Sequence, residues 1–255
     1  QDFHPASTSS SGDFSNNSID SLHAKMQFLG LSNIQLHVGT FESTMNQKDA
    51  EALRFSLIFL DCDLYDGYME ALSPVFQGKP FNLAEENLQA RIRGTLLMAV
   101  SNKFGHILLN TTNKSEAAVG YGTLYGDMNG GLSILGDLYK LEVYDLARYI
   151  NHDKEIIPLN SIEKAPSAEL RPGQKDSDSL PEYDILDQIL YQYIELRKGP
   201  DAIIHQGFDE ATVKKVLKMV NTTEYKRHQT PPILRVSSKA FGTGRRMPIV
   251  GKYLA

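Results

Sequence analysis

The segment TTNKSEAAVGYGTLYGDMNGG, residues 111–131, collects polar side chains and glycines directly after the apolar run HILLN. Ligands of open α/β sheets bind beyond the carboxyl ends of the strands, so a strand at HILLN would place the hydroxyl of Thr111 or of Thr112 where it can contact a phosphate or a base. Glu116 offers the kind of ligand that Mg²⁺ takes, because this ion binds few protein carboxylates and completes its shell with phosphate oxygens and water. Asn113 and Glu116 also match an N-x-x-E capping box, which by itself would explain Glu116.

Two charged residues further along indicate a sugar or an anion as ligand. Asp127 lies in a glycine-rich turn, where its carboxylate could hold a ribose hydroxyl or form an ordinary Asx turn. Lys140 falls in the first turn of a predicted helix, where the helix dipole disfavours a cation. Either Asp137, one turn earlier, neutralises Lys140, or an outside anion such as a phosphate does.

Three other places carry groups suited to phosphates or carboxylates. Arg91 and Arg93 have guanidinium groups that bind such anions with two hydrogen bonds, although a solvated helix face is the ordinary explanation. The segment KAPSAELRPGQKDSDSLPEYD, residues 164–184, places Ser167 beside prolines and could close over a ligand. Lys226–His228 is a short basic cluster.

The elements that must position these residues alternate between helix and strand. Asn82 and Glu85 form a capping box that opens a helix to about Asn102, ended by Gly105. The apolar stripe of this helix consists of Leu88, Ile92, Leu96 and Val100. A short, fully buried strand is expected at His106–Leu109.

Asp137 should open the next helix, and two further helices are expected at 183–197 and 209–220. The residues of the helix after Asp137 that should share a face are Tyr139, Val143, Leu146 and Ile150. Nearer the start, helices are predicted at 19–29, 48–54 and 64–72 and strands at 34–38 and 56–60. The order helix, strand, glycine-rich loop, helix is typical of an α/β protein with a parallel sheet.

Composition excludes several classes of protein. The chain has 255 residues and a net charge of −5, which argues against a nucleic-acid backbone as partner. No apolar run is long enough to span a membrane. The single cysteine, Cys62, cannot form an internal disulfide, and the scattered histidines match no zinc spacing. Because the first residues lack the pattern of a signal peptide, we expect a cytoplasmic protein.

Several blocks of sequence, taken together and in order, resemble the synthetase domain of glutamine-dependent NAD synthetases. They are ENLQARIRG, SNKFGHILLNTTNKSEAAVGYGTLYGD, PSAELRP, DSLPEYD, EYKR and GRRMPI, between about Glu85 and Ile249. The resemblance implies a Rossmann-like parallel sheet of the adenine-nucleotide α-hydrolase (ATP-pyrophosphatase) type with C-terminal helices. It also implies one synthetase domain over 1–255, with a polar flexible start at 1–18 and an extended arm at 230–255.

The family resemblance also implies an activity. Such enzymes adenylate the nicotinate carboxylate of deamido-NAD with Mg-ATP, and ammonia then displaces AMP to leave NAD. By motif position, the residues expected to contact ATP are Thr111, Lys140 and Ser167, with Lys140 also catalytic and Glu116 binding Mg²⁺. The residues expected to bind deamido-NAD are Arg91, Asp127, Tyr225 and Lys226.

The resemblance further implies partners. The family works as a homodimer and takes its nitrogen from ammonia or from glutamine. Glutamine is used through an N-terminal glutaminase domain, which this sequence lacks, so we expect a domain of a larger protein. Neither a nucleic acid nor a membrane is expected as partner.

One family motif departs from the pattern. The S-G-G-x-D-S loop that cradles pyrophosphate has its nearest match in NNSIDS, residues 16–21, which keeps Asp20 and Ser21 but has Asn17 and Ser18 in place of the glycines. A second alignment puts this segment on the helix after the family's second strand, which leaves the loop missing. Two functions therefore stay open: the amide-forming ligase, and a non-catalytic nucleotide-binding or dimerisation fragment without a working pyrophosphate loop.

Overall fold

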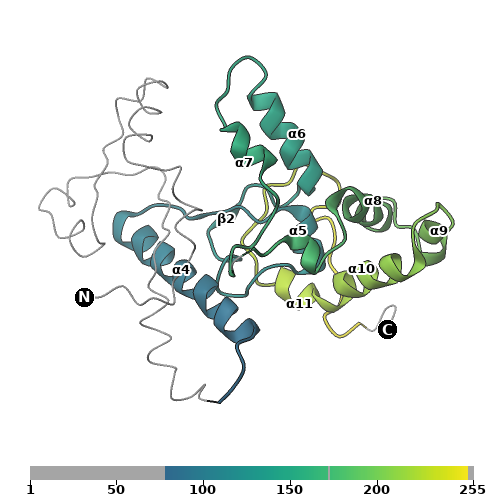
Figure 1. The fold of residues 1–255 in the computed structure, drawn as a ribbon, viewed down its shortest axis with the longest axis horizontal. Helices are drawn as coiled ribbons and strands as arrows, with labels where there is room; N and C mark the ends of the chain where they lie inside the picture. Colours follow the sequence, from purple (N-terminus) through teal and green to yellow (C-terminus); the bar gives the residue numbers. More distant parts are fainter. Residues whose placement is uncertain (1–77, 172, 252–255) are drawn as a thin grey trace, which may run out of the picture. The chain divides into compact units, whose positions relative to one another are not determined.

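The computed structural model describes residues 78–171 and 173–251, all within Phe55–Ala255, one of two units into which the chain divides (Figure 1). The helices are α4 (Leu83–Phe104), α5 (Lys114–Val119), α6 (Lys140–Ile150), α7 (Leu159–Glu163), α8 (Tyr183–Ile194), α9 (Pro200–Ile204), α10 (Glu210–Thr222) and α11 (Glu224–Arg227). The strands are β1 (Leu109–Asn110) and β2 (Leu132–Ser133), and a 3-10 turn spans Asp176–Asp178. The elements predicted before residue 77, and the segment Asn16–Ser21, lie outside the described residues.

The sheet is parallel, as the sequence predicted. Leu109 pairs with Leu132 and Asn110 pairs with Ser133. The segment after Thr230 adds to the far side of β2, where the N–H of Ser133 donates to Pro232 O at 2.8 Å and the N–H of Leu234 donates to Ser133 O at 2.9 Å. The arm expected at 230–255 is therefore docked, in its first part, against β2.

The strand predicted at His106–Leu109 is wrong in extent and in burial. The observed strand β1 begins at Leu109, and Ile107 and Leu109 are 72% and 41% exposed. Within the described residues β1 pairs with β2 alone. Only Asn110, which faces β2 and the loop before it, is fully buried there.

Helix α4 has the ends that its sequence predicted. Asn82 and Glu85 form the capping box, and Gly105 closes the helix with a left-handed φ of 69°. The face pressed against the rest of the chain differs from the predicted stripe, of which only Ile92 is buried. Ala90 and Gly94 are the close contacts, because a Cβ added at Gly94 would lie 2.9 Å from Gly126 O.

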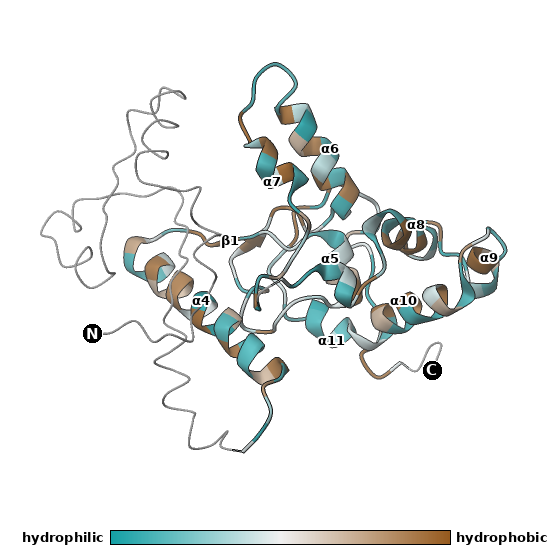
Figure 2. Cartoon of the chain, in the orientation of Figure 1, coloured by the Kyte–Doolittle hydropathy of each residue, from teal (hydrophilic) through white to brown (hydrophobic). Residues whose placement is uncertain are grey.

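The hydrophobic core lies between α5, α8, α9 and α10. Apolar residues recur every three or four positions along α8 and α10, which places them on one face of each helix (Figure 2). The core residues that are less than 2% exposed include Ala118, Leu186, Ile189, Leu190, Ile194, Ile203, Val213, Val216, Leu217 and Val220. This core fixes α5, whose two ends carry the candidate site.

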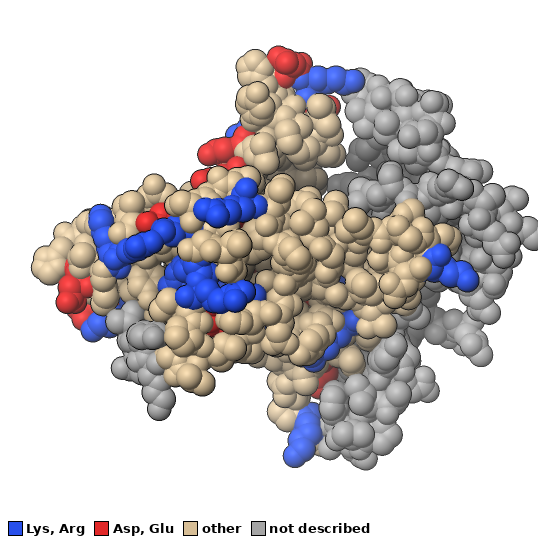
Figure 3. All heavy atoms as spheres, turned by 180° about the vertical axis from the view of Figure 1, so that it is seen from behind, with Lys and Arg blue, Asp and Glu red and all other residues tan. Residues whose placement is uncertain are grey.

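Charge is unevenly distributed although the chain is acidic as a whole. Lys and Arg side chains gather toward one side of the face seen in Figure 3, with few carboxylates among them. Among the described helices none is both long enough and apolar enough to cross a membrane.

Candidate active site

Glu116 is both a helix cap and a partner of Lys140. Its Oε2 accepts the Asn113 N–H at 3.1 Å, and the Asn113 Oδ1 accepts the Glu116 N–H at 3.0 Å, so the predicted capping box is confirmed. The other carboxylate oxygen, Oε1, lies 3.3 Å from the Lys140 ammonium. Burial raises the pKa of Glu116, while the Lys140 charge and the Asn113 N–H oppose the rise.

Lys140 is neutralised differently from what the sequence suggested. Helix α6 begins at Lys140 and not at Asp137, and Asp137 bonds elsewhere. The Lys140 ammonium contacts Glu116 and lies 5.4 Å from the centre of the Tyr183 ring and 5.8 Å from that of Tyr144. A carboxylate and two aromatic faces therefore surround this ammonium.

The first backbone donors of α6 are taken by side chains of this chain. The Lys140 N–H donates to Ser115 Oγ at 2.9 Å, and the Leu141 N–H donates to Asp187 Oδ2 at 3.0 Å. Ser115 in turn donates to Asp187 Oδ1 at 2.5 Å. Asp187 thus occupies the place that the sequence suggested for a phosphate, and any phosphate would have to meet the Lys140 side chain instead.

Lys114 and Asp137 form a buried ion pair, which with its hydrogen-bond partners is called the node. The sequence analysis considered Asp137 only as a partner of Lys140 and did not consider Lys114. The Lys114 ammonium contacts Asp137 Oδ1 at 2.7 Å, Glu195 Oε1 at 2.5 Å and Ser237 Oγ at 3.0 Å. Asp137 Oδ2 accepts the N–H groups of Val236 and Ser237 at 2.8 and 2.5 Å. The node ties the start of α5 to the end of α8 and to the arm.

Three of the four residues predicted to bind the dinucleotide are found at the segment 120–127, which follows α5. Arg91 and Lys226 bond to this segment, and Asp127 is its last residue. Arg91 Nε donates to Leu124 O at 3.2 Å, and Asp127 Oδ1 accepts the Thr123 N–H at 2.5 Å. The Lys226 ammonium donates to the carbonyls of Gly120 and Gly122, each at 2.7 Å. The Asp127 carboxylate accepts from the N–H four residues earlier, whereas in an Asx turn it would accept from the N–H two residues later. The hydrogen bond to Thr123 is therefore not an Asx turn.

The remaining predicted residues are Thr111, Ser167 and Tyr225. Thr111 is exposed and follows β1 directly, at the carboxyl end where the sequence placed it. Ser167 is half-buried, and its Oγ accepts the Glu169 N–H at 3.0 Å. Tyr225 is 42% exposed beside Lys226. Among the hydrogen bonds of the described residues, none joins Thr111 or Ser167 to Glu116 or Lys140.

Arg227 does not belong to an exposed basic cluster, contrary to the sequence interpretation of Lys226–His228. It is 7% exposed, and its guanidinium lies 5.0 Å from the centre of the Phe241 ring. It forms an ion pair with Glu224 at 2.8 Å and donates to the carbonyls of Ala117 and Ala118 at 3.1 and 2.6 Å. Its donors are therefore occupied within the fold, and a ligand could not use them.

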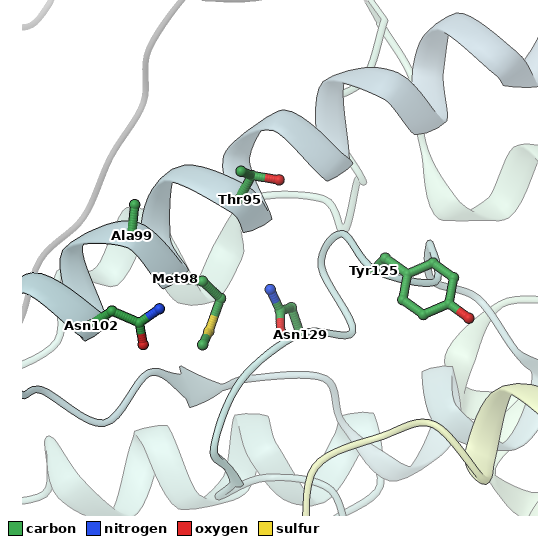
Figure 4. A pocket seen from close by; sticks show the side chains of 6 residues that line it. All are labelled: Thr95, Met98, Ala99, Asn102, Tyr125 and Asn129. Atoms are coloured by element: carbon green, nitrogen blue, oxygen red, sulfur yellow. The ribbon is translucent and has the colours of Figure 1, made fainter.

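An open pocket of about 460 Å³ lies apart from these groups, between α4 and the loop after Leu124 (Figure 4). The residues that line it are Thr95, Met98, Ala99, Asn102, Tyr125 and Asn129. None of these six residues carries a carboxylate or an ammonium.

Comparisons with known proteins identify the family of the chain. The NAD synthase family model matches residues 20–230. A glutamine-dependent NAD(+) synthetase of Synechocystis sp. is 56% identical over 182 residues, which cover 71% of this chain and 33% of that protein. The corresponding protein of Thermotoga maritima is 46% identical over 234 residues, which cover 88% of this chain and 41% of that protein.

One solved structure supports the fold. The crystal structure of a glutamine-dependent NAD(+) synthetase from Cytophaga hutchinsonii superposes with a TM-score of 0.56 at 22% identity, over 74% of this chain and 32% of that one. The fold is thus the Rossmann-like, ATP-pyrophosphatase type that the sequence predicted. The chain spans between a third and about two fifths of the length of the curated relatives named above. By its sequence, its fold and its family match, the chain belongs to the NAD synthase family.

Proposed function

We propose that the chain catalyses the ATP-dependent amidation of deamido-NAD to NAD through an adenylated carboxylate. The proposal depends on the match of residues 20–230 to the NAD synthase family and on one structural observation, the contact of Glu116 with Lys140. Glu116 and Lys140, a metal-binding type of side chain and a phosphate-binding one, are 3.3 Å apart beyond the carboxyl end of β1. The two relatives described above are both glutamine-dependent NAD(+) synthetases, which supports this activity.

The proposed reaction has two steps. An oxygen of the nicotinate carboxylate attacks the α-phosphorus of ATP, the bond to the bridging oxygen breaks, and pyrophosphate leaves. Ammonia then attacks the carbonyl carbon of the mixed anhydride. The bond from this carbon to the oxygen shared with phosphorus breaks, AMP leaves with that oxygen, and the nitrogen loses a proton to give the amide. Charge develops on phosphate oxygens in the first step, where the Lys140 ammonium would stabilise it.

Mg²⁺ fits the residues present. The described residues contain no group of three or more His, Cys, Asp or Glu side chains arranged to hold a metal. A single carboxylate such as Glu116 suits an ion that arrives with ATP and keeps phosphate oxygens and water as its other ligands. When bound, the ion would neutralise phosphate charge, and Glu116 would have to exchange its contact with Lys140 for the metal.

The two substrates would occupy opposite ends of α5. Glu116 lies in its first turn, and Gly120, which accepts from Lys226, is its C-cap. The helix has six residues, so at 1.5 Å per residue its ends are about 9 Å apart. We assign the ATP contacts to Thr111, Lys140 and Ser167 and the deamido-NAD contacts to Arg91, Asp127, Tyr225 and Lys226.

Further parts of the proposal follow from the family. Residues 1–255 would form one synthetase domain, with the arm at 230–255, and would act as a homodimer in the cytoplasm. The start at 1–18 lies outside the described residues. The nitrogen would come from ammonia, or from glutamine where a glutaminase domain supplies it.

The test is an end-point assay of the purified chain with deamido-NAD, Mg-ATP and excess ammonium, in which NAD and AMP are separated by chromatography. Equal amounts of NAD and AMP are expected. No NAD, with deamido-NAD still bound, would contradict the ligase and favour the non-catalytic fragment.

A further inference from the structure

Asp176 joins two segments of the candidate site that the motif positions do not connect. It is 4% exposed and opens the 3-10 turn Asp176–Asp178. Its Oδ2 accepts the Tyr183 hydroxyl at 2.7 Å. Its N–H donates to Pro166 O at 3.0 Å, directly before Ser167. One residue thus fastens the segment that carries Ser167 to the first turn of α8.

The Tyr183 ring carries this connection to Lys140. The ring centre lies 5.4 Å from the Lys140 ammonium, which also forms the ion pair with Glu116. Burial, the charge of Glu116 and the hydrogen bond to Asp176 raise the pKa of Tyr183, so its hydroxyl stays protonated and keeps donating. The orientation of the ring therefore depends on the bond to Asp176.

The carboxylate is only half satisfied, which is unusual for a residue that merely supports the fold. Asp176 Oδ1 is buried and lies within hydrogen-bond distance of no donor among the described residues, although the Tyr121 hydroxyl, whose pKa burial and Asp176 raise, is close by. Burying a carboxylate oxygen without a partner is unfavourable, and such groups in native proteins call for an explanation other than stability. A role in the site explains why a carboxylate stands here.

We propose that Asp176 is a positioning residue of the adenylation step, which holds the Ser167 segment in place and, through the Tyr183 ring, orients Lys140 toward the ATP phosphates. The inference rests on the proposed ligase activity. It requires Asp176 and Tyr183 to act as one unit, and it places their effect on the ATP side of α5 and not on the deamido-NAD side.

The experiment is a double-mutant cycle with Asp176→Ala, Tyr183→Phe and the double variant, in which KM for Mg-ATP and for deamido-NAD and kcat are measured in the full chain. Each single variant should lower kcat/KM for Mg-ATP by about tenfold or more, because small misplacements of positioned groups are costly. The double variant should be no worse than Asp176→Ala, because the two changes remove the same hydrogen bond. KM for deamido-NAD should stay within about twofold in all three.

Two further variants separate positioning from general loss of structure. Asp176→Asn keeps an oxygen that can accept from Tyr183 and should restore kcat/KM to within about threefold of the unmodified chain. Tyr193→Phe, the matched control on α8, removes a hydroxyl that donates to Asn221 Oδ1 at 3.0 Å and should leave KM for Mg-ATP unchanged.

The outcomes distinguish this inference from the proposed function. If the unmodified chain makes NAD but the cycle is additive, or Asp176→Ala matches Tyr193→Phe, the positioning role is overturned. If the unmodified chain makes no NAD, the ligase proposal fails, and calorimetric titration with Mg-ATP then decides. Weaker binding by both Asp176→Ala and Tyr183→Phe, with Tyr193→Phe unchanged, supports the role. Equal binding by all variants, weaker binding by only one of Asp176→Ala and Tyr183→Phe, or no binding by the unmodified chain overturns it.

Discussion

Lys114 and Asp137 meet at 2.7 Å with neither side chain exposed to solvent at all. They lie 23 residues apart in the sequence, and Asp137 also accepts the backbone N–H groups of Val236 and Ser237. The pair therefore joins α5, the loop before α6 and the arm at one buried point. Removing one partner leaves the other as an uncompensated charge in the interior.

The first prediction concerns this pair. We expect Lys114→Met to lower the free energy of unfolding by about 3–5 kcal/mol, because it strands Asp137 and Glu195. Urea unfolding followed by circular dichroism measures the change. Lys214→Met is the matched control, since Lys214 pairs with Glu210 at the surface. A loss equal to that of the control would show that the buried pair does not stabilise the fold.

The second prediction is a pH dependence. Burial alone would raise the pKa of Asp137, but hydrogen bonds from Lys114, Ser237 and Val236 outweigh burial, and the pKa lies below its ordinary value of 3.8. A carboxyl with a lower pKa in the folded chain stabilises the fold above the unfolded value, and this contribution is lost as the pH falls through the folded value. The difference in unfolding free energy between the unmodified chain and Asp137→Asn should therefore be constant near neutral pH and shrink below about pH 4.

Urea unfolding at a series of pH values checks this second prediction. The exposed Asp145, exchanged for Asn, is the control and should show no such trend. A difference that stays constant down to about pH 2 would contradict the linkage.

The third prediction tests Lys140. Lys140→Met should reduce kcat/KM for Mg-ATP by about a hundredfold or more, since it removes the charge that we propose stabilises phosphate oxygens. Lys140→Arg should retain part of the activity because the charge stays. NAD formation measures both, and Lys218→Met, a lysine on the outer part of α10, is the control. Wild-type turnover by Lys140→Met would remove Lys140 from the catalytic assignment.

The fourth prediction concerns the dinucleotide side. Lys226 binds the carbonyls of Gly120 and Gly122, and burial lowers its pKa while the charge of Asp127 opposes that shift. Lys226→Met should raise KM for deamido-NAD by about tenfold and leave KM for Mg-ATP within about twofold. Lys215→Met, which removes a similar bond to the carbonyl of Ser179, is the control. An equal rise for both substrates would argue against two separate ends of α5.

The fifth prediction concerns the contact of α4 with the loop. A methyl group at Gly94 would lie 2.9 Å from Gly126 O, a backbone atom that cannot give way cheaply. Gly94→Ala should therefore destabilise the fold by about 1–3 kcal/mol in urea unfolding and weaken deamido-NAD binding through Arg91. Gly199→Ala is the control, because nothing lies within 4 Å of a Cβ added there. Equal stability of the two variants would show that the close approach is not needed.

Local signals in the sequence predicted what local physics decides. The capping boxes at Asn82 and Asn113 and the left-handed Gly105 are set by residues within one turn, and all three are confirmed. The helices at 183–197 and 209–220 were found as α8 and α10 from their apolar spacing. The roles assigned to the site residues came from motif order and stay predictions.

Partners distant in sequence could not be read from the chain. The start of α6 was misplaced by three residues because Asp137, a plausible N-cap, is taken by Lys114, while Ser115 and Asp187 bind the first N–H groups of the helix. Arg227 was grouped with Lys226 by sequence, although only the fold shows that it points inward. Burial of β1 was overestimated because apolar residues alone do not reveal which side of a strand is covered.

Arg227 has a consequence for how the chain opens. Its guanidinium donates both to the last carbonyls of α5, at Ala117 and Ala118, and to Val220 O near the end of α10. Helix ends normally fray independently, because each has its own unpaired carbonyls. Here one guanidinium serves two helix ends, so a movement of Arg227 unpairs carbonyls of both helices at once. The two C-terminal turns should exchange their amide hydrogens as a single cooperative unit.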